Sequence, residues 1–321
     1  MIAAVSSPTK QEIESAAELL APVLARLPLL PLGGANAEDI HIAPEVHQPG
    51  GCFKVRGVFH AVARMTPEER ERGLSTVSAG NTAKALAWCG RHFGVSARSL
   101  MPDHAPRTKI EAMRALGGTP VLVPVEEVFA FMKGHLWEEQ PYSFVHPWTD
   151  RRVMTGHGTL GFEIADALPD VDSVYVPVGG GGLLAGVGSA LRARSPHVRI
   201  VAVEPEGCPS FHAAREAGQP VDVDCDTMCD GVAVPYTTAE MFPLLNRLAD
   251  ESHLVSEADV RAAIRRLALK NHIVAEGSGA LAVAAALADP PERRGRAVAL
   301  VTGGSIDAAT LAEVLAEGAP R

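Results

Sequence analysis

A run of four glycines at residues 179–182 follows the apolar stretch 173–178 and precedes an apolar helical pattern that begins at Leu183. Because glycine has no Cβ atom, the backbone N–H groups of such a loop can converge on an anion. The dipole of the following helix adds positive potential there. A flexible loop is the alternative, but four glycines directly after a buried strand carry an entropic cost. The pattern therefore predicts a phosphate-binding loop.

The common nucleotide motifs do not fit this loop. No Gly-Lys-Ser/Thr follows the glycines, so the loop is not a Walker motif. The dinucleotide pattern Gly-x-Gly-x-x-Gly is met only loosely, because Leu184 breaks its phase, and no acidic residue stands clearly at the ribose distance. We therefore expect a phosphorylated ligand that is not a nucleotide.

Lys54 is the second chemically informative residue, and it lies just before an apolar helical pattern. A lysine at such a place is ordinarily solvated. Together with a phosphate loop that has no Walker motif, it suggests a lysine that forms a Schiff base with pyridoxal phosphate. His157 could also be read as a base, but a histidine near a helix start is more often polar packing.

The elements that must position these residues alternate between strand and helix. The patterns predict strands at 74–79, 99–102, 120–124, 173–178, 198–204 and 297–302, and helices at 9–26, 55–64, 82–93, 107–116, 150–168, 183–194, 257–270, 278–288 and 307–317. Such alternation predicts an α/β fold with a parallel sheet covered on both faces. Ligands bind at the carboxyl ends of such strands. We therefore expect the loops at 78–81, 179–182 and 302–305, and the loop after Glu204, to share one edge.

Composition narrows the class of partner. The 321 residues are enough for two lobes, and the net charge of −9 argues against nucleic acid or an anionic membrane as a partner. No apolar run is long enough to span a bilayer, and no basic segment precedes the apolar start of the chain, so we expect a cytoplasmic protein.

The five cysteines are scattered and odd in number, which is typical of reduced thiols rather than of a disulfide framework. Cys225 and Cys229 lie four residues apart, but no second Cys or His pair completes a zinc site. We therefore expect free thiols and no structural zinc.

Seven motifs then occur in a fixed order, namely Gly-Cys-Phe-Lys-Val-Arg-Gly at 51–57, Ser-Ala-Gly-Asn at 78–81, Pro-Val-Gly-Gly-Gly-Gly-Leu-Leu-Ala-Gly at 177–186, Val-Glu-Pro at 203–205, Asp-Gly-Val-Ala-Val at 230–234, Glu-Gly-Ser-Gly-Ala at 276–280 and Thr-Gly-Gly-Ser-Ile-Asp at 302–307. From about residue 31 to the last helix, the chain resembles the fold-type II pyridoxal-phosphate enzymes of the threonine and serine dehydratase and serine racemase family. The resemblance implies a tryptophan synthase β-like fold in two lobes, each with a mostly parallel sheet flanked by helices. It places a large cofactor-binding domain at 1–72 and 148–321 and a small mobile domain at 73–147, and it implies a homodimer.

The resemblance also implies a role for each matching position. Lys54 would form the Schiff base with the cofactor and then act as the general base, which requires a neutral amine. The other cofactor contacts would be Phe53, Asn81, Gly179, Gly180, Gly181, Gly182, Leu183, Glu276 and Thr302. The substrate carboxylate would be bound by Ser78, Ala79, Gly80, Asn81 and Thr82.

Three departures from the family pattern refine the prediction. Ala79 stands where racemases of the family carry a second Ser, so dehydration is favoured over racemization. Thr82 replaces the usual His and is similar to threonine synthases, which leaves the substrate open. The cation site of the family is degenerate here, because Ser210 replaces the acidic side chain beside Glu204 and the Cys208 carbonyl. Cys52 and Ser305 are smaller departures near the cofactor.

The predicted reaction is β-elimination of water from a hydroxy amino acid such as L-serine or L-threonine, which gives a 2-oxo acid and ammonia. Three alternatives stay open at this point. They are β- or γ-replacement on the same cofactor, racemization, and a non-catalytic sensor that keeps the pocket. The chain has no room for the regulatory C-terminal domain of biosynthetic threonine dehydratases, so we expect an unregulated, degradative enzyme.

Overall fold

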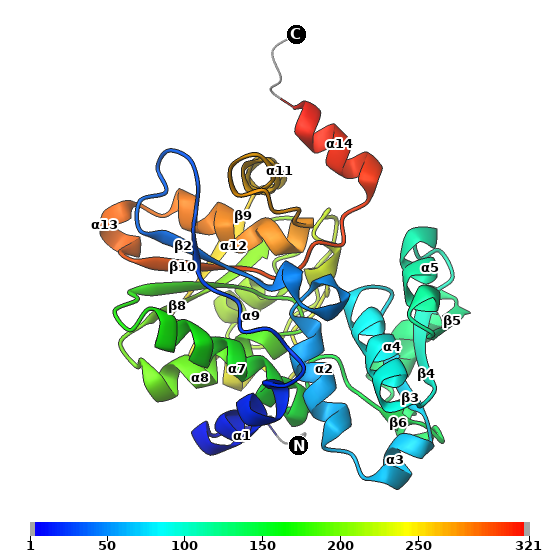
Figure 1. Cartoon of the computed structure of the whole chain (residues 1–321). Helices are drawn as coiled ribbons and strands as arrows, with labels where there is room; N and C mark the ends of the chain where they lie inside the picture. The colour runs from blue at the N-terminus through cyan, green and yellow to red at the C-terminus, as the bar shows by residue number, and fades with distance from the viewer. Residues whose placement is uncertain (1–3, 318–321) are drawn as a thin grey trace.

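The computed structural model describes residues 4–317, which fold around two sheets (Figure 1). The larger sheet has the strand order β1 (Leu30–Pro31), β2 (Ile40–Pro44), β10 (Ala297–Val301), β7 (Ser173–Pro177), β8 (Arg199–Pro205) and β9 (Glu251–Val255). The smaller sheet has the order β5 (Thr119–Val123), β4 (Ala97–Pro102), β3 (Leu74–Val77) and β6 (Ser143–Phe144). Every strand pair is parallel except β1 with β2.

Helices cover both faces of the larger sheet (Figure 1). One face carries α7 (Arg151–Ala167), α8 (Gly182–Arg194), α9 (Ser210–Ala217) and α10 (Phe242–Leu248). The other carries α11 (Glu257–Arg266), α12 (Gly277–Ala288) and α14 (Ala308–Ala316). Strand β7 shows why both faces are apolar, because Val174 and Val176 join the first helical layer while Tyr175 joins the second. Among the helices of residues 4–317, none combines the length and the hydropathy that crossing a bilayer requires.

The remaining helices are α1 (Lys10–Leu20), α2 (Lys54–Ala63), α3 (Pro67–Glu71), α4 (Asn81–Phe93), α5 (Arg107–Ala115), α6 (Val125–Lys133) and α13 (Pro291–Arg294). Figure 1 shows α2 between α7 on one side and α4 of the smaller sheet on the other. The strands of the smaller sheet all lie within the segment predicted to be the small domain, whose boundaries stay a prediction.

Most of the predicted elements are present, and the differences have local causes. The helix expected at 9–26 ends at Leu20, and the one expected at 257–270 ends at Arg266, where a π-helical turn, Leu267–Asn271, follows. The patterns missed β2, β6, β9, α3, α6, α9, α10 and α13. Strand β9, with the sequence Glu-Ser-His-Leu-Val, is an edge strand whose side chains are mostly half-buried, so it lacks the apolar run of a central strand.

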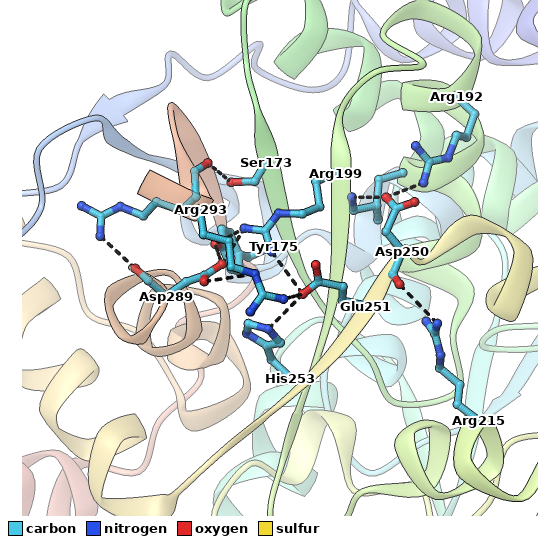
Figure 2. Close-up of polar contacts among 12 residues, drawn as sticks. Ser173, Tyr175, Arg192, Arg199, Arg215, Asp250, Glu251, His253, Asp289 and Arg293 are labelled. Atoms are coloured by element: carbon cyan, nitrogen blue, oxygen red, sulfur yellow. Dashed lines mark hydrogen bonds and ion pairs between the residues drawn. The ribbon is translucent and has the colours of Figure 1, made fainter. Parts of the chain in front are cut away.

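Charged side chains join the amino ends of β8 and β9 to the end of α12 (Figure 2). Arg199 at the start of β8 forms ion pairs with Asp289 and Glu251, and it donates to the Tyr175 hydroxyl at 3.0 Å. The Tyr175 hydroxyl in turn donates to Asp289 at 2.5 Å. These contacts brace the sheet edge opposite the one where the predicted functional loops emerge.

Arg56 is an almost fully enclosed charge, with 1% of its side chain exposed. It donates to both carboxylate oxygens of Glu45, at 2.7 and 2.8 Å, and to both of Glu163, at 2.7 and 2.8 Å. A fifth bond reaches the Thr159 hydroxyl at 3.1 Å. The guanidinium therefore joins α2 to α7 and to the turn after β2. All five of its N–H donors are engaged in these bonds.

We expect the variant Arg56→Met to lower the free energy of unfolding by about 3–5 kcal/mol, because the buried carboxylate of Glu45 loses its cation. Chemical denaturation followed by circular dichroism measures this. The matched control is Arg26→Met, which removes an exposed ion pair with Asp166 at 3.3 Å and should cost less than about 1 kcal/mol. Equal losses in the two variants would contradict the role given to Arg56.

Candidate active site

Sheet order places the loop that carries Lys54 beside the two glycine-rich loops. Strand β10 lies between β2 and β7, so the segments that follow these three strands emerge next to one another. Backbone contacts then join two of them. Cys52 forms an isolated bridge with Gly303, Phe53 N–H donates to the Thr302 carbonyl at 3.0 Å, and Gly304 N–H donates to the Gly51 carbonyl at 3.0 Å.

Lys54 is the first residue of α2, and its amine has no hydrogen bond or ion pair to any residue in 4–317. Its Nζ lies 4.8 Å from the centre of the Phe53 ring. Burial lowers the pKa of this amine, and the nearby Cys52 and Glu276 oppose the shift only in part. Lys54 is thus a half-buried amine biased toward its neutral form, as a nucleophile or a base requires.

The glycine loop joins the end of β7 to the start of α8 at Gly182. Gly181 has a φ of +87°, which side-chain-bearing residues rarely adopt. A Cβ at Gly180 would overlap the indole of Trp148, and one at Gly179 would lie 2.8 Å from Cα of Val232. The first N–H groups of α8 have no partner within the helix, so the loop offers donors at a positive helix end.

The second half of the predicted site gathers around Glu276, whose side chain is 5% exposed. Asn81 Nδ2 donates to Glu276 Oε1 at 2.6 Å, and the N–H of Ser305 donates to Oε2 at 3.2 Å. Burial raises the pKa of the Glu276 carboxyl, while Lys84, Asn81 and Lys109 act in the opposite direction. Thr302 Oγ1, in the loop after β10, donates to the carbonyl of Ser278 in the first turn of α12 at 3.2 Å.

The stretch expected to bind the substrate carboxylate forms the turn from β3 into α4. Ser78 Oγ accepts the N–H of Gly80 at 3.1 Å, and α4 begins at Asn81 without a side-chain cap. The free N–H groups at this helix start suit a carboxylate. Ala79 offers only a methyl group, which packs near the Ala83 cluster, and Thr82 is buried.

These residues fit a phosphorylated aldehyde cofactor. An unpartnered amine, a glycine loop that admits no Cβ and a helix start rich in free N–H groups lie at neighbouring strand ends of one structure. A family model described as pyridoxal-phosphate dependent enzyme matches residues 20–303. The chain belongs to this family. Pyridoxal phosphate is therefore its cofactor, and the expected fold-type II architecture is confirmed.

Individual relatives agree with this assignment. The chain is 36% identical over 318 residues to an L-threonine ammonia-lyase of Thermotoga maritima, an alignment that covers 97% of this chain and 79% of the relative. Among solved structures, the threonine deaminase of T.th. is similar with a TM-score of 0.84 and 31% identity over 94% of this chain and 99% of that one. Maize serine racemase gives a TM-score of 0.88 and 26% identity, with 96% and 97% covered.

The residues of the degenerate cation site are occupied by protein contacts. The Glu204 carboxylate is 1% exposed and accepts the N–H groups of Phe211 at 2.8 Å and His212 at 2.7 Å, so it caps α9. Ser210 Oγ donates to it at 3.4 Å. Burial raises the pKa of Glu204 to about 7, against the lowering effect of these hydrogen bonds.

Cys208 is paired with Cys225, which corrects the expectation of five free thiols. The loop that carries Cys225 folds back over Gly207, where Asp226 N–H donates to the Gly207 carbonyl at 2.8 Å. This return brings the two Cα atoms within 4.4 Å although 17 residues separate them in sequence. Cys52, Cys89 and Cys229 are free and buried.

His157 lies behind the site rather than in it. Its ring is fully buried between α2 and α8 and packs 4.8 Å from the Phe53 ring. Neither ring nitrogen has a partner in the described chain, and burial holds the pKa of His157 well below its ordinary value. It supports Phe53 as a neutral packing residue.

Sequence reasoning missed two lysines that lie near Glu276. Lys84 stands one helical turn after Asn81 on α4, and Lys109 on α5 forms an ion pair with Asp230. The spacing of three residues on a helix could have placed Lys84 beside Asn81. The pairing of Lys109 with Asp230 joins segments 121 residues apart, which no local pattern reveals.

A cavity of about 390 Å³ lies beside this site and does not contain the predicted residues. It is lined by α6, the turn Leu136–Glu139 and residues 220–222 and 236–240. Trp148 stands between the cavity and the glycine loop.

We expect millimolar Mg²⁺ to leave the melting temperature of the natural chain unchanged, because Glu204 is occupied by the start of α9. The variant Ser210→Asp adds the missing carboxylate, and about 10 mM Mg²⁺ should then raise its melting temperature by about 2 °C. Differential scanning fluorimetry measures both, with the exposed Ser96→Asp as the control. A chelator-sensitive melting temperature in the natural chain would refute this interpretation of Glu204.

Proposed function

We propose that this chain eliminates water from a β-hydroxy amino acid, L-threonine or L-serine, and releases a 2-oxo acid and ammonia. The observation that carries the proposal is the unpartnered, half-buried amine of Lys54 beside the glycine loop. It is supported by the 36% identity to an L-threonine ammonia-lyase, which extends over 97% of the chain.

Bound pyridoxal phosphate supplies an electron sink for the pair left when the α-proton departs. The protein supplies the rest. Lys54 Nζ takes the α-proton, and the lowered pKa of the amine favours the neutral form that this role requires. The turn at 78–82 and the start of α4 hold the substrate carboxylate through backbone N–H groups.

Two further residues bias the outcome. Thr302 offers a neutral hydroxyl to the cofactor ring nitrogen rather than a carboxylate, which makes a milder electron sink and suits elimination over transamination. Ala79 has no proton to give from the face opposite Lys54, which disfavours racemization. Where the family usually has His, this chain has Thr82, as in threonine synthases. This position therefore keeps β- or γ-replacement on the same cofactor as the second candidate reaction.

The same proposal includes the surroundings of the site. The turn at 78–82 belongs to a small domain at 73–147, and the rest of the chain forms the cofactor-binding domain. We place the enzyme in the cytoplasm, and we expect a homodimer, as the resemblance implies. Light scattering on the purified chain tests the dimer.

The variant Lys54→Ala should lower release of 2-oxo acid from L-threonine and L-serine by about 10³-fold or more, because it removes both the attachment point and the base. A coupled keto-acid assay measures this, with the exposed Lys10→Ala as the control. Borohydride reduction of the natural enzyme should attach the cofactor mass to the peptide that contains Lys54.

Three outcomes would redirect the proposal. Inverted amino acid without keto acid indicates a racemase, and consumption of an added nucleophile indicates replacement. Cofactor attached to a different peptide contradicts the role of Lys54.

A further inference from the structure

Lys84 links the two sides of the site. It lies on α4, next to the smaller sheet, and its Nζ donates to the Gly50 carbonyl at 3.0 Å and to the Ser305 hydroxyl. Gly50 precedes α2, and Ser305 follows β10 of the larger sheet. One ammonium group therefore contacts both large-sheet segments that flank Lys54 and Thr302.

The contacts continue from Ser305 to Glu276 as a chain of hydrogen bonds. Ser305 Oγ donates to Asn81 Oδ1 at 2.9 Å, and Asn81 Nδ2 donates to Glu276 Oε1 at 2.6 Å. A lysine ammonium can only donate, and a carboxylate can only accept. Both ends of the chain therefore impose one donor-to-acceptor direction, which runs from the ammonium of Lys84 to the carboxylate of Glu276. The Ser305 hydroxyl must accordingly donate its hydrogen bond to Asn81.

This direction fixes the amide of Asn81. Its oxygen accepts from Ser305, one hydrogen on Nδ2 is given to Glu276, and the second hydrogen has no partner among residues 4–317. Hydrogen bonds that run in one direction also polarise one another, which strengthens the chain as a whole. The remaining N–H of Asn81 is available to a ligand in the site.

The loop after β10 is shaped around these contacts. A Cβ at Gly303 would overlap Glu276 Oε1 and would lie 3.1 Å from Asn81 Nδ2. The N–H of Ser305 holds the second oxygen of Glu276 at 3.2 Å. The contact between Asn81 and Glu276 therefore needs glycine at this position.

Charge completes the arrangement. Burial raises the pKa of the Glu276 carboxyl, and Lys84 is the strongest of the groups that lower it, ahead of Asn81, Lys109 and the N–H of Ser305. Lys109 is already paired with Asp230. Without Lys84, a protonated Glu276 could donate a hydrogen bond to Asn81. The side-chain amide of Asn81 could then rotate by half a turn and exchange the positions of its oxygen and nitrogen.

We propose that Lys84 is a positioning residue that acts through Ser305 on Asn81, so that Asn81 presents one fixed N–H donor to the ring oxygen of the bound cofactor. The inference rests on the proposed function, since that oxygen belongs to pyridoxal phosphate. A hydrogen bond to the ring oxygen alters both the absorption of the bound cofactor and its affinity, which gives two readouts besides turnover.

The test compares four variants of the full chain loaded with pyridoxal phosphate. Lys84→Met removes the donor and the charge, Lys84→Arg keeps both, Ser305→Ala interrupts the chain while keeping both charges, and Lys109→Met removes the other cation. Absorption from about 300 to 500 nm is recorded across pH, and cofactor affinity, kcat and KM are measured.

We expect Lys84→Met and Ser305→Ala to shift the pH midpoint of the cofactor band by about 1 unit and to weaken cofactor binding about 10-fold. Their kcat should fall more than their KM changes, because the substrate carboxylate is bound elsewhere. Lys84→Arg should stay close to the natural enzyme. A fifth variant, which combines Lys84→Met with Ser305→Ala, should be no worse than either single one, because both substitutions break the same chain.

Two results would overturn the inference. Ser305→Ala with a natural spectrum and affinity would show that Lys84 does not act through Ser305. A shift in Lys109→Met as large as that in Lys84→Met would show a general effect of charge.

A cofactor-free measurement separates this inference from the proposed function. The side-chain amide resonances of Asn81, identified by their loss in Asn81→Asp, should move in Lys84→Met and Ser305→Ala but not in Lys109→Met. If they move while the natural enzyme releases no 2-oxo acid from L-threonine or L-serine, the proposed function fails and the hydrogen-bond chain stands. If they do not move, the chain itself is refuted.

Discussion

The site depends on the buried guanidinium of Arg56, which lies two residues after Lys54 on the same helix. Because Arg56 binds Glu45 and Glu163 with both edges of its fork, it fixes the rotation of α2 and its distance from α7. That rotation decides where the amine of Lys54 points. A cation with fewer donors could hold the same helices together but would leave the rotation of α2 less determined.

Close helix contacts add to this constraint. Along α7, a Cβ at Gly156 would overlap the Arg56 carbonyl of α2, and one at Gly161 would lie 2.8 Å from the Val187 carbonyl of α8. Helix α7 therefore joins the helix of the lysine to the helix of the glycine loop at near-backbone contact. This packing holds the amine of Lys54 and the glycine loop, the two parts of the proposed cofactor site, at a fixed separation.

The sequence predicted those parts of the site that depend on local backbone chemistry. The glycine loop, the strand before it and the lysine are visible because residue type alone limits what they can do. Strand β2 was missed, although its position next to β10 brings Lys54 to the correct edge. The hydrogen bonds from Lys84 to Ser305 and from Asn81 to Glu276 could not be predicted from the sequence. They join residues 221 and 195 positions apart, and they depend on side-chain geometry. The pairing of Cys208 with Cys225 likewise depends on how a loop returns over Gly207.

The distribution of charge around Glu276 explains why this buried carboxylate does not cancel the lowering of the Lys54 pKa by burial. A carboxylate paired directly with Lys54 would raise the pKa of the amine and remove its basicity at neutral pH. Here, both oxygens of Glu276 are engaged by Asn81 and the N–H of Ser305, while its charge is balanced by Lys84 and Lys109. Glu276 thus contributes only a partial opposing effect, and burial dominates the pKa of Lys54. The amine of Lys54 stays unpaired because the Glu276 carboxylate has other partners.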